Sequence, residues 1–417
     1  MGTRFRERGF SSGGKIVGSD GFSQNDIIWE VDFRRFPLSD GTNAGYHTSL
    51  LTSKGLTLAR ASSATVQTST STITTTGLGV DAPRLGDAGY GQGLVIESSR
   101  TNLVPTSREI GGTGWTQGTG NFETGSYADG PDGSVLSADR LYRPDGLVYS
   151  DYVATAVTAG VSYTGGFWAR GTSGASGYNP FVADVQLITQ PVSAIWTRKT
   201  HTVEAVATTT GYWQVQTGTP TAAALDIVCD LHQLEVGKFA TEVILTSGAS
   251  ATRAGESISV DASRLVRAGR IGLELEFVPK AGTLAAMIDS WGNQRQIHIV
   301  SGTYSLISCL TGTVSVVVGG NTFTTTGAIT HVAGDTHNLW IEAGGGLLAT
   351  RVVWRKKALG GSYGSAVVLG TSAAPQGNHT ATGSLYFLGD SLSRYMLDAW
   401  VKRIVAYTPG RRPTWAA

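Results

Sequence analysis

The chain has 417 residues, of which 56 are Gly and 15% are charged, and its formal net charge is +1. Soluble domains hold about 25% charged residues, many of them on exposed helices, so this composition excludes a helical bundle or coiled coil over most of the chain. A net charge near zero provides no electrostatic footprint for nucleic acid or an anionic membrane. The only two cysteines, Cys229 and Cys309, are too few for a disulfide scaffold. They also lie too far apart in sequence for a clustered Cys-based zinc site. We therefore interpret both as buried thiols.

Residues 1–25 are basic and rich in Gly and Ser. They contain the candidate attachment residues Arg4, Phe5, Arg6, Arg8 and Phe10. Such an arm is disordered in isolation, but its two Phe side chains are apolar groups that a partner can bury, so the alternative is a docking tail that folds on a partner. The segment has no apolar stretch of the secretory type, and we expect no signal peptide and no membrane span.

The first alternating run starts at Trp29. Trp29, Val31 and Phe33 fall on one side and acidic residues on the other, which predicts a half-buried β-strand. Residues 61–80 are mostly Thr and Ser. Because β-branched Thr favours extended backbone, we predict a polar strand or hairpin there rather than a disordered linker.

Two blocks of strand-like runs follow, and turn-forming Gly, Asn, Asp and Pro separate the runs. In residues 105–262 the candidate strands are 147–153, 162–169, 182–188, 200–206, 212–217 and 225–236. In residues 263–417 they are 271–278, 284–288, 296–300, 304–309, 313–318, 322–326, 338–343, 349–354, 384–388 and 400–407. In the C-terminal block the runs recur at a spacing of about 8–12 residues, which is typical of β-sandwiches. Helical periodicity is absent apart from one short turn at 391–398.

No catalytic set is readable in the sequence. Glu274 and Glu276 lie two apart in a strand and share one face, which we interpret as a solvated sheet face. Asp129 and Asp132 are local neighbours without the partner carboxylate that glycoside hydrolysis needs. Residues 360–364 spell Gly-x-Ser-x-Gly, but a strand-like run follows instead of the helix of a nucleophile elbow, so we predict a turn. We therefore expect no catalytic residue and no enzyme activity.

Metal ligands are also sparse. His331 and His337, with Asp335 between them, come nearest to a metal cluster, but the pattern lacks a further ligand and a second shell. Residues 289–293 form a loop of a kind that can hold Ca²⁺, although one Asp and one Asn are too few ligands. We expect no metal site and no cofactor, with Ca²⁺ as the sole alternative.

Aromatic side chains are the remaining candidates for a binding site. Trp and Tyr rings stack on the flat C–H faces of sugar rings, and neighbouring polar groups bind hydroxyl groups. The candidates in predicted loops are Trp115, Tyr142, Tyr149, Tyr178, Trp291, Tyr363 and Tyr395, with Asn293 as a polar neighbour. The alternative for each is packing at a rim or at a subunit contact. We expect the core to contain the strand residues Trp168, Trp213, Trp340 and Trp400.

Three stretches resemble motifs of bacteriophage structural proteins. Residues 58–65 (LARASSAT) resemble the TRASSAT segment that opens many phage tail and spike proteins. Residues 81–84 (DAPR) and 93–103 (GLVIESSRTNL) resemble PRFDY…GLLIEEARTNLL. Residues 233–254 contain QLEVGKFAT, TSG and TRA and resemble QLEAGAFATSYIPTSG…VTRAAD, although VIL at 243–245 replaces SYIP. The three motifs occur in the family's order and spacing.

The resemblance implies an all-β fold with two β-sandwich domains. Between the second and third motifs the family has a jelly roll like those of carbohydrate-binding modules. The C-terminal block resembles a concanavalin A-like (laminin-G-like) sandwich, through THNLWI at 336–341 and AWVKRIVAY at 399–407. The implied domains are a virion-attachment arm and small β region at 1–57, a connecting segment at 58–104, the jelly roll at 105–262 and the concanavalin A-like lectin sandwich at 263–417.

The resemblance also implies a function. It predicts a non-catalytic appendage of a phage or gene-transfer-agent particle, a tail fibre or head spike, that binds host capsular or cell-surface polysaccharide. It implies other virion structural proteins as partners and a homo-oligomer (a trimer, or a pentamer at a capsid vertex) whose repeated sites raise avidity. The expected location is the surface of a particle made in the host cytoplasm. The competing interpretation is a decoration or baseplate protein that binds no glycan, and an enzyme that trims capsule has the least support.

Overall fold

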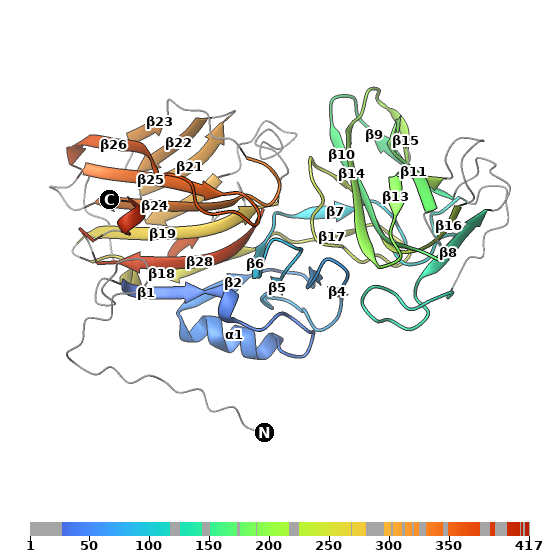
Figure 1. The fold of residues 1–417 in the computed structure, drawn as a ribbon, viewed down its shortest axis with the longest axis horizontal. Coiled ribbons are helices and arrows are strands. Elements are labelled where there is room, and N and C mark those ends of the chain that lie inside the picture. Colours follow the sequence, from blue (N-terminus) through green and yellow to red (C-terminus); the bar gives the residue numbers. More distant parts are fainter. Residues whose placement is uncertain are drawn as a thin grey trace, which may run out of the picture.

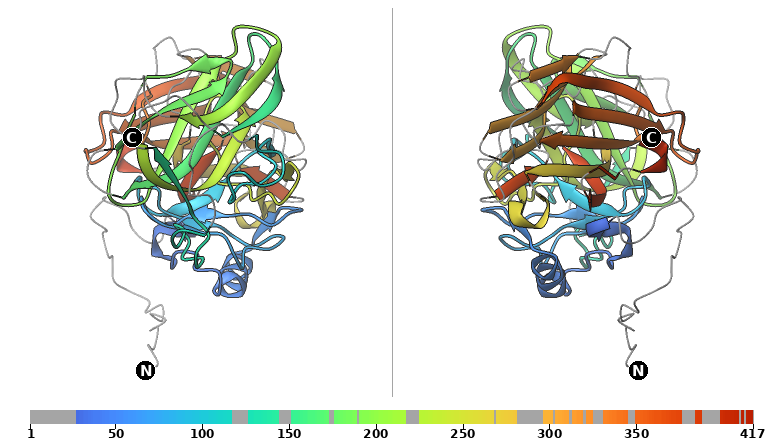
Figure 2. Two further views of the ribbon diagram at one scale, coloured as in Figure 1. Left: turned by 90° about the vertical axis from the view of Figure 1, so that its right-hand side faces the viewer. Right: turned by 90° about the vertical axis from the view of Figure 1, so that its left-hand side faces the viewer.

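The computed structural model describes residues 27–416 apart from 117–125, 144–150, 173–175, 189, 217–224, 268, 281–295, 302, 311–312, 319–320, 325–330, 345–348, 376–383, 388–397, 409 and 412. The protein is all-β, as predicted, and has two β-sandwich lobes (Figure 1). In the end-on views the helix of the N-terminal segment, drawn in blue, lies at the bottom of the molecule (Figure 2).

The C-terminal lobe is built on an eight-stranded antiparallel sheet. Its order is β26-β25-β24-β19-β28-β6-β5, and β1 pairs with β28 beside this path. The strands are β1 (Ile27–Asp32), β5 (Leu85–Gly86), β6 (Gly93–Ile96), β19 (Arg270–Pro279), β24 (Thr336–Gly344), β25 (Ala349–Lys357), β26 (Val367–Pro375) and β28 (Ala399–Tyr407). The sheet therefore joins strands from both ends of the chain.

Two smaller sheets belong to the same lobe. One has the order β2-β18-β27 and the other β20-β21-β22-β23. The strands are β2 (Leu56–Ala59), β18 (Ser257–Asp261), β20 (Gln296–Ser301), β21 (Thr303–Leu310), β22 (Thr313–Val318), β23 (Asn321–Thr324) and β27 (Ser384–Phe387). Ile258 and Phe387 of the first small sheet share one buried core with Leu273, Leu275 and Ile404 of the large sheet. Burial of one face of each sheet is what defines a sandwich.

The other lobe is a sandwich of two antiparallel sheets. One has the order β14-β10-β16-β8, and the other has the order β12-β11-β15-β9 with β13 paired to β11. The strands are β8 (Asp139–Arg143), β9 (Tyr152–Val157), β10 (Ser162–Gly171), β11 (Ser176–Ala183), β12 (Val185–Gln186), β13 (Gln190–Val192), β14 (Thr197–Glu204), β15 (Thr209–Gln216) and β16 (Leu225–Val236). Phe167 and Trp213 lie at the centre of its core.

This lobe is inserted into the C-terminal lobe. The chain leaves through β7 (Arg100–Asn102) and returns through β17 (Ala251–Arg253). The two strands pair antiparallel, with Arg100 opposite Arg253, and they lie side by side between the lobes (Figure 1). The next strand, β18, already belongs to the C-terminal lobe.

The insertion corrects the predicted domain boundaries. Residues 27–57 and the β5–β6 segment do not form a separate arm and connector, because their strands pair within the sheets of the C-terminal lobe. The boundary predicted at 262/263 is also displaced, since β18 pairs with β2 and β27. These pairings join residues distant in sequence, so the linear spacing of strand signals did not reveal them. Residues 1–26 lie outside the described part of the chain.

Local predictions near the N-terminus are confirmed in two places. Trp29, Val31 and Phe33 are buried, the first two in β1 and the third in the adjoining short helix. The Thr/Ser-rich segment forms a hairpin of β3 (Val66–Gln67) and β4 (Ile73–Thr74). The short 3-10 helices are η2 (Phe33–Arg35), η3 (Ala262–Arg264) and η5 (Thr414–Ala416).

One helix was not predicted. α1 (Ala44–Ser53) buries His47 and Leu51, which lie four apart on one face. This apolar signal is too short to stand out among Ser, Thr and Gly residues. Gly55 follows the helix with φ of +75°, the conformation that favours Gly at a helix end.

The predicted core residues Trp168, Trp213, Trp340 and Trp400 are all buried, and Cys229 is a buried free thiol. The strand predicted at 284–288 lies outside the described residues, as does the predicted turn at 391–398 except for Asp398.

Candidate functional site

Charged residues of the three motifs meet at the junction of the lobes in a buried group, here called the junction cluster. Each of these side chains is at most 2% exposed. The cluster comprises Arg60, Arg84, Glu97, Glu242, Arg253, Glu256 and Lys280. All but Glu256 and Lys280 come from the motif segments, so these segments specify how the lobes join.

Glu256 is the first anionic centre of the cluster. Arg60 Nη1 lies 2.7 Å from Glu256 Oε1, and Arg84 donates to both carboxylate oxygens. The backbone N–H of Glu97 also donates to Glu256, at 2.8 Å. A buried carboxylate with this many donors compensates for the loss of its hydration.

Glu97 is the second anionic centre. Its carboxylate lies 2.8 Å from Arg84 Nη1 and 2.9 Å from Arg253 Nη1. Lys280 Nζ lies 2.6 Å from Glu97 and 2.7 Å from Glu242, and so links the end of β19 to the loop after β16. The ion pairs therefore connect segments of both lobes.

Acid is expected to destabilise the fold through this cluster. Burial alone favours the neutral acids, but the surrounding cations hold the pKa of Glu97 well below its ordinary value of 4.5 and also lower the pKa of Glu256. A carboxylate whose pKa is lower in the folded state adds stability above its unfolded pKa and loses that stability as the pH falls. We expect the urea midpoint to fall steeply below about pH 4.5.

The measurement is a series of urea titrations followed by intrinsic fluorescence. Glu256→Gln should show a shallower acid dependence than the wild type, while Glu204→Gln, at an exposed position on β14, should keep the wild-type slope. A midpoint that is constant from about pH 5 to about pH 3 would contradict the expectation.

A pocket of about 380 Å³ opens beside the junction cluster, between the lobes, and is called the interlobe pocket. It combines aromatic, hydroxyl and cationic side chains. The described lining residues are Gln67, Ala88, Tyr90, Arg198, Thr200, Thr202, Lys238, Phe239, Ala240, Glu242, Lys280, Ala333 and Trp400.

The C-terminal lobe supplies the aromatic wall of the pocket. Tyr90, in the loop between β5 and β6, packs against Trp400 of β28 with ring centroids 5.1 Å apart. Lys280 Nζ lies 4.4 Å from the centroid of the Trp400 ring. Gly334 lies against Tyr90 with φ of +87°, and a Cβ there would lie 3.0 Å from the tyrosine ring. Tyr90 is thus held in place while the residue stays partly exposed.

The inserted lobe supplies the polar wall. Arg198, Thr200 and Thr202 alternate along β14 and share its outer face. The intervening residues point inward: His201 bonds to the hydroxyl of Tyr178 at 2.7 Å, and Val203 is buried in the core. Arg198 donates to the carbonyl of Thr241, which fixes the guanidinium at the pocket. The wall therefore presents two hydroxyl groups and one guanidinium in a row.

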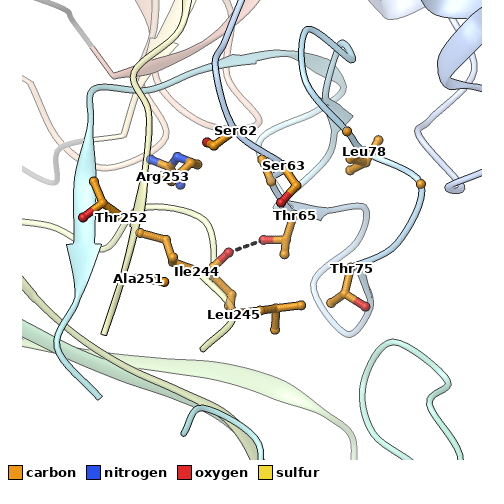
Figure 3. A pocket seen from close by; sticks show the side chains of 14 residues that line it. Ser62, Ser63, Thr65, Thr75, Leu78, Ile244, Leu245, Ala251, Thr252 and Arg253 are labelled. Atoms are coloured by element: carbon orange, nitrogen blue, oxygen red, sulfur yellow. Dashed lines mark hydrogen bonds between the residues drawn. The ribbon is translucent and has the colours of Figure 1, made fainter. Parts of the chain in front are cut away.

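A second pocket, of about 400 Å³, lies on the RASSAT segment (Figure 3). Short polar and aliphatic side chains line it, and none of its described lining residues is aromatic. Thr65 donates to the carbonyl of Val243 at 2.6 Å, which ties the two sides together. Arg253 belongs to the junction cluster. This pocket offers hydrogen bonds but no stacking surface, so the interlobe pocket is the better candidate for a sugar ring.

Two of the predicted sugar-binding residues are buried and offer no stacking surface: Trp115, which lies in a loop as predicted, and Tyr178, which lies in a strand instead. Trp115 is 9% exposed, its ring packs edge-on against His232, and its Nε1 donates to the carbonyl of Thr106 at 2.9 Å. Tyr178 is fully buried and packs against Phe167. Tyr178 lies within β11, because the chain stays extended where Gly, Asn and Pro were interpreted as a turn.

Tyr142 and Tyr363 are partly exposed, but arginines of the same chain contact their rings. The Arg140 guanidinium lies 4.6 Å from the centroid of Tyr142, and the Arg355 guanidinium lies 4.1 Å from that of Tyr363. Neither Tyr lines the interlobe pocket. The other candidates lie outside the described residues; they are Tyr149, Trp291, Asn293 and Tyr395, and the arm residues Arg4, Phe5, Arg6, Arg8 and Phe10.

The interpretation of Glu274 and Glu276 as a solvated pair is wrong. Both are buried on the large sheet, at 3% and 5% exposure. Glu276 accepts from Arg34 at 3.1 Å and from the Tyr363 hydroxyl at 2.9 Å, and Glu274 accepts from Asn338 at 2.7 Å. Both carboxylates are therefore engaged in hydrogen bonds with other side chains of the chain.

The His331–Asp335–His337 group is compact and buried, with ligand atoms within 4.8 Å of one another. Trp354 Nε1 donates to Nδ1 of His337 at 3.1 Å, which places the proton of the neutral imidazole on Nε2. That nitrogen lies 2.9 Å from Nδ1 of His331. Burial lowers the pKa of His337 to about 3, so the neutral form prevails. In this tautomer both nitrogens of His337 are used in hydrogen bonds, so the geometry favours a hydrogen-bonded chain over a metal site.

No protein-family model and no curated protein sequence matches the chain. Among solved structures, the N-terminal CBM22-1-CBM22-2 tandem domain of Paenibacillus barcinonensis Xyn10C shares 10% identity and a TM-score of 0.26, over 75% of this chain and 99% of that one. A likeness at this TM-score does not establish a shared fold. Within the described residues, no helix is both long and apolar enough to cross a membrane.

Proposed function

We propose that the chain is a non-catalytic glycan-binding protein of a phage or phage-derived particle, a tail fibre or head spike, and that the interlobe pocket binds host polysaccharide. The observation that carries the proposal is the opposition, across one pocket, of an aromatic wall and a wall of hydroxyl and cationic groups. The role in adsorption rests on the motif resemblance.

The pocket has the composition that sugar recognition requires. The exposed part of Tyr90 offers a flat apolar surface for the C–H face of a sugar ring. Thr200, Thr202 and Lys238 surround it with groups that donate to or accept from sugar hydroxyls. A single pocket of this kind binds weakly, and repeated copies on a particle compensate through effective concentration.

Tyr90→Ala is expected to reduce polysaccharide binding by more than about tenfold, since burying an aromatic face contributes about 1.5–3 kcal/mol. Binding of the full chain is measured on a glycan array and then by calorimetry. Tyr90→Phe keeps the ring and should retain affinity. Tyr46→Ala removes a tyrosine that is 51% exposed on α1, away from the pocket, and should have no effect.

Three outcomes would contradict the proposal. The first is glycan binding that Tyr90→Ala leaves intact, which would move the site elsewhere. The second is the absence of binding to any host polysaccharide while binding to other virion proteins is retained, which would favour the decoration or baseplate function. Release of reducing sugar from host capsule would contradict the non-catalytic role.

A further inference from the structure

The described cations of the interlobe pocket outnumber its acids. Arg198, Lys238 and Lys280 line it, and Glu242 is the one described lining residue that is acidic. Lys280 is neutralised, because its Nζ lies within 2.7 Å of both Glu97 and Glu242. Within the described part of the chain, neither Arg198 nor Lys238 forms an ion pair with a carboxylate. The charge of these two residues is therefore available to a ligand.

The two available cations belong to the same lobe. Arg198 is on the outer face of β14, and Lys238 is in the turn that follows β16. Both β14 and β16 pair with β10, on opposite sides of it. Arg198 is opposite Trp168, whereas Val236, two residues before Lys238, is opposite Tyr163, so the two cations line different ends of the same pocket wall. The aromatic wall formed by Tyr90 and Trp400 belongs to the other lobe.

Resting on the proposed function, we infer that the saccharide bound in the interlobe pocket is acidic and carries a carboxylate on the ring, as hexuronic and sialic acids do. One ring lies against Tyr90, and carboxylates on successive rings of the bound oligosaccharide are bound by Arg198 and by Lys238. The guanidinium binds a carboxylate through a planar pair of N–H groups, whereas the ammonium acts as a mobile point charge. Neutral saccharides would leave both cations without a counter-charge.

The test compares acidic polysaccharides with their carboxyl-reduced counterparts, which keep the linkage and lose the charge. Oligomers of polygalacturonate, alginate, hyaluronate and polysialate are titrated into the full chain by calorimetry, each beside its reduced form. We expect at least one acidic form to bind about tenfold or more tightly than its reduced form, because hydrogen bonds to charged groups are the stronger class. Affinity should fall as salt rises.

Lys238→Gln and Arg198→Gln are each expected to weaken binding of the acidic form by about tenfold and to leave the reduced form unchanged. Lys54→Gln removes an exposed cation at the end of α1 and serves as the charge-matched control. If Lys54→Gln weakens binding equally, the attraction is non-specific and the inference fails.

The failures of the two proposals are distinguishable. The acidic ligand is overturned if acidic and reduced forms bind with equal affinity, or if neutral glycans alone bind. If Tyr90→Ala still abolishes that binding, the proposed glycan site is retained. Absence of binding to every acidic and neutral saccharide overturns the proposed function itself.

Discussion

Replacing Glu256 with Gln is expected to lower the free energy of unfolding by about 3–5 kcal/mol, the usual cost of removing one partner from a buried ion pair. The Glu256 carboxylate accepts from Arg60 and Arg84, and all three side chains are 0% exposed. Because Gln carries no charge, the two buried guanidinium groups of Arg60 and Arg84 lose the anion that they share. Burial already lowers the pKa of Arg60, and Arg84 beside it adds to that effect.

The measurement is equilibrium urea unfolding at neutral pH. Glu204→Gln, at an exposed position, is the control and should stay within about 0.5 kcal/mol of the wild type. Adding Arg60→Met to Glu256→Gln removes one of the two cations left without an anion. The double variant should therefore recover part of the lost free energy of unfolding, so the effects of the two substitutions are expected to be strongly non-additive. A loss below about 1 kcal/mol for Glu256→Gln would show that the cluster does not hold the lobes together.

Trp213→Ala is expected to cost about 3–5 kcal/mol in the inserted lobe. Its indole is fully buried, lies 5.8 Å from the Phe167 ring between centroids, and donates to His232 Nδ1 at 3.3 Å. It also fills the space above Gly165, where a Cβ would lie 2.3 Å from the ring. Truncation leaves a cavity in this core and an imidazole nitrogen without its donor.

Thermal and urea unfolding monitored by circular dichroism measure this loss. Trp213→Phe keeps part of the volume and should lose less. Ile188→Ala, at a side chain that is 81% exposed on the same lobe, should be neutral within about 0.5 kcal/mol. If Trp213→Ala unfolds with the wild-type midpoint, the lobe is not organised around this ring.

The junction cluster gives the sequence motifs a physical meaning. Arg60, Arg84 and Glu97 come from the first two motifs, and Glu242 and Arg253 from the third. They are buried and paired with one another, so these motif positions serve folding, although Glu242 also lines the interlobe pocket. The candidate binding surface lies beside them, and most of its described lining residues, among them Tyr90, Arg198, Thr200 and Thr202, lie outside these three motifs.

The sequence by itself determined the strand content and the side chains that form the two cores. Period-two alternation is a local property, so Trp29 and Val31 could be assigned to the buried side of a strand without knowledge of the fold. Low charge and dense turn residues likewise favoured an all-β fold, and the motif resemblance implied two β-sandwiches. The same local signals were insufficient for Tyr178, since flanking Gly, Asn and Pro residues are compatible with both a loop and a buried strand, and for Trp115, whose loop packs its ring into the core.

Only the tertiary structure decided which strands pair and which charges meet. Arg60 and Glu256 lie 196 positions apart, and Arg84 and Glu256 lie 172 apart. No local pattern records such a partner, because an isolated charged residue in sequence is equally suited to a solvated surface and to a buried pair. The insertion of one lobe between β7 and β17, and the pocket that forms where the lobes meet, follow from these distant contacts and not from any single segment.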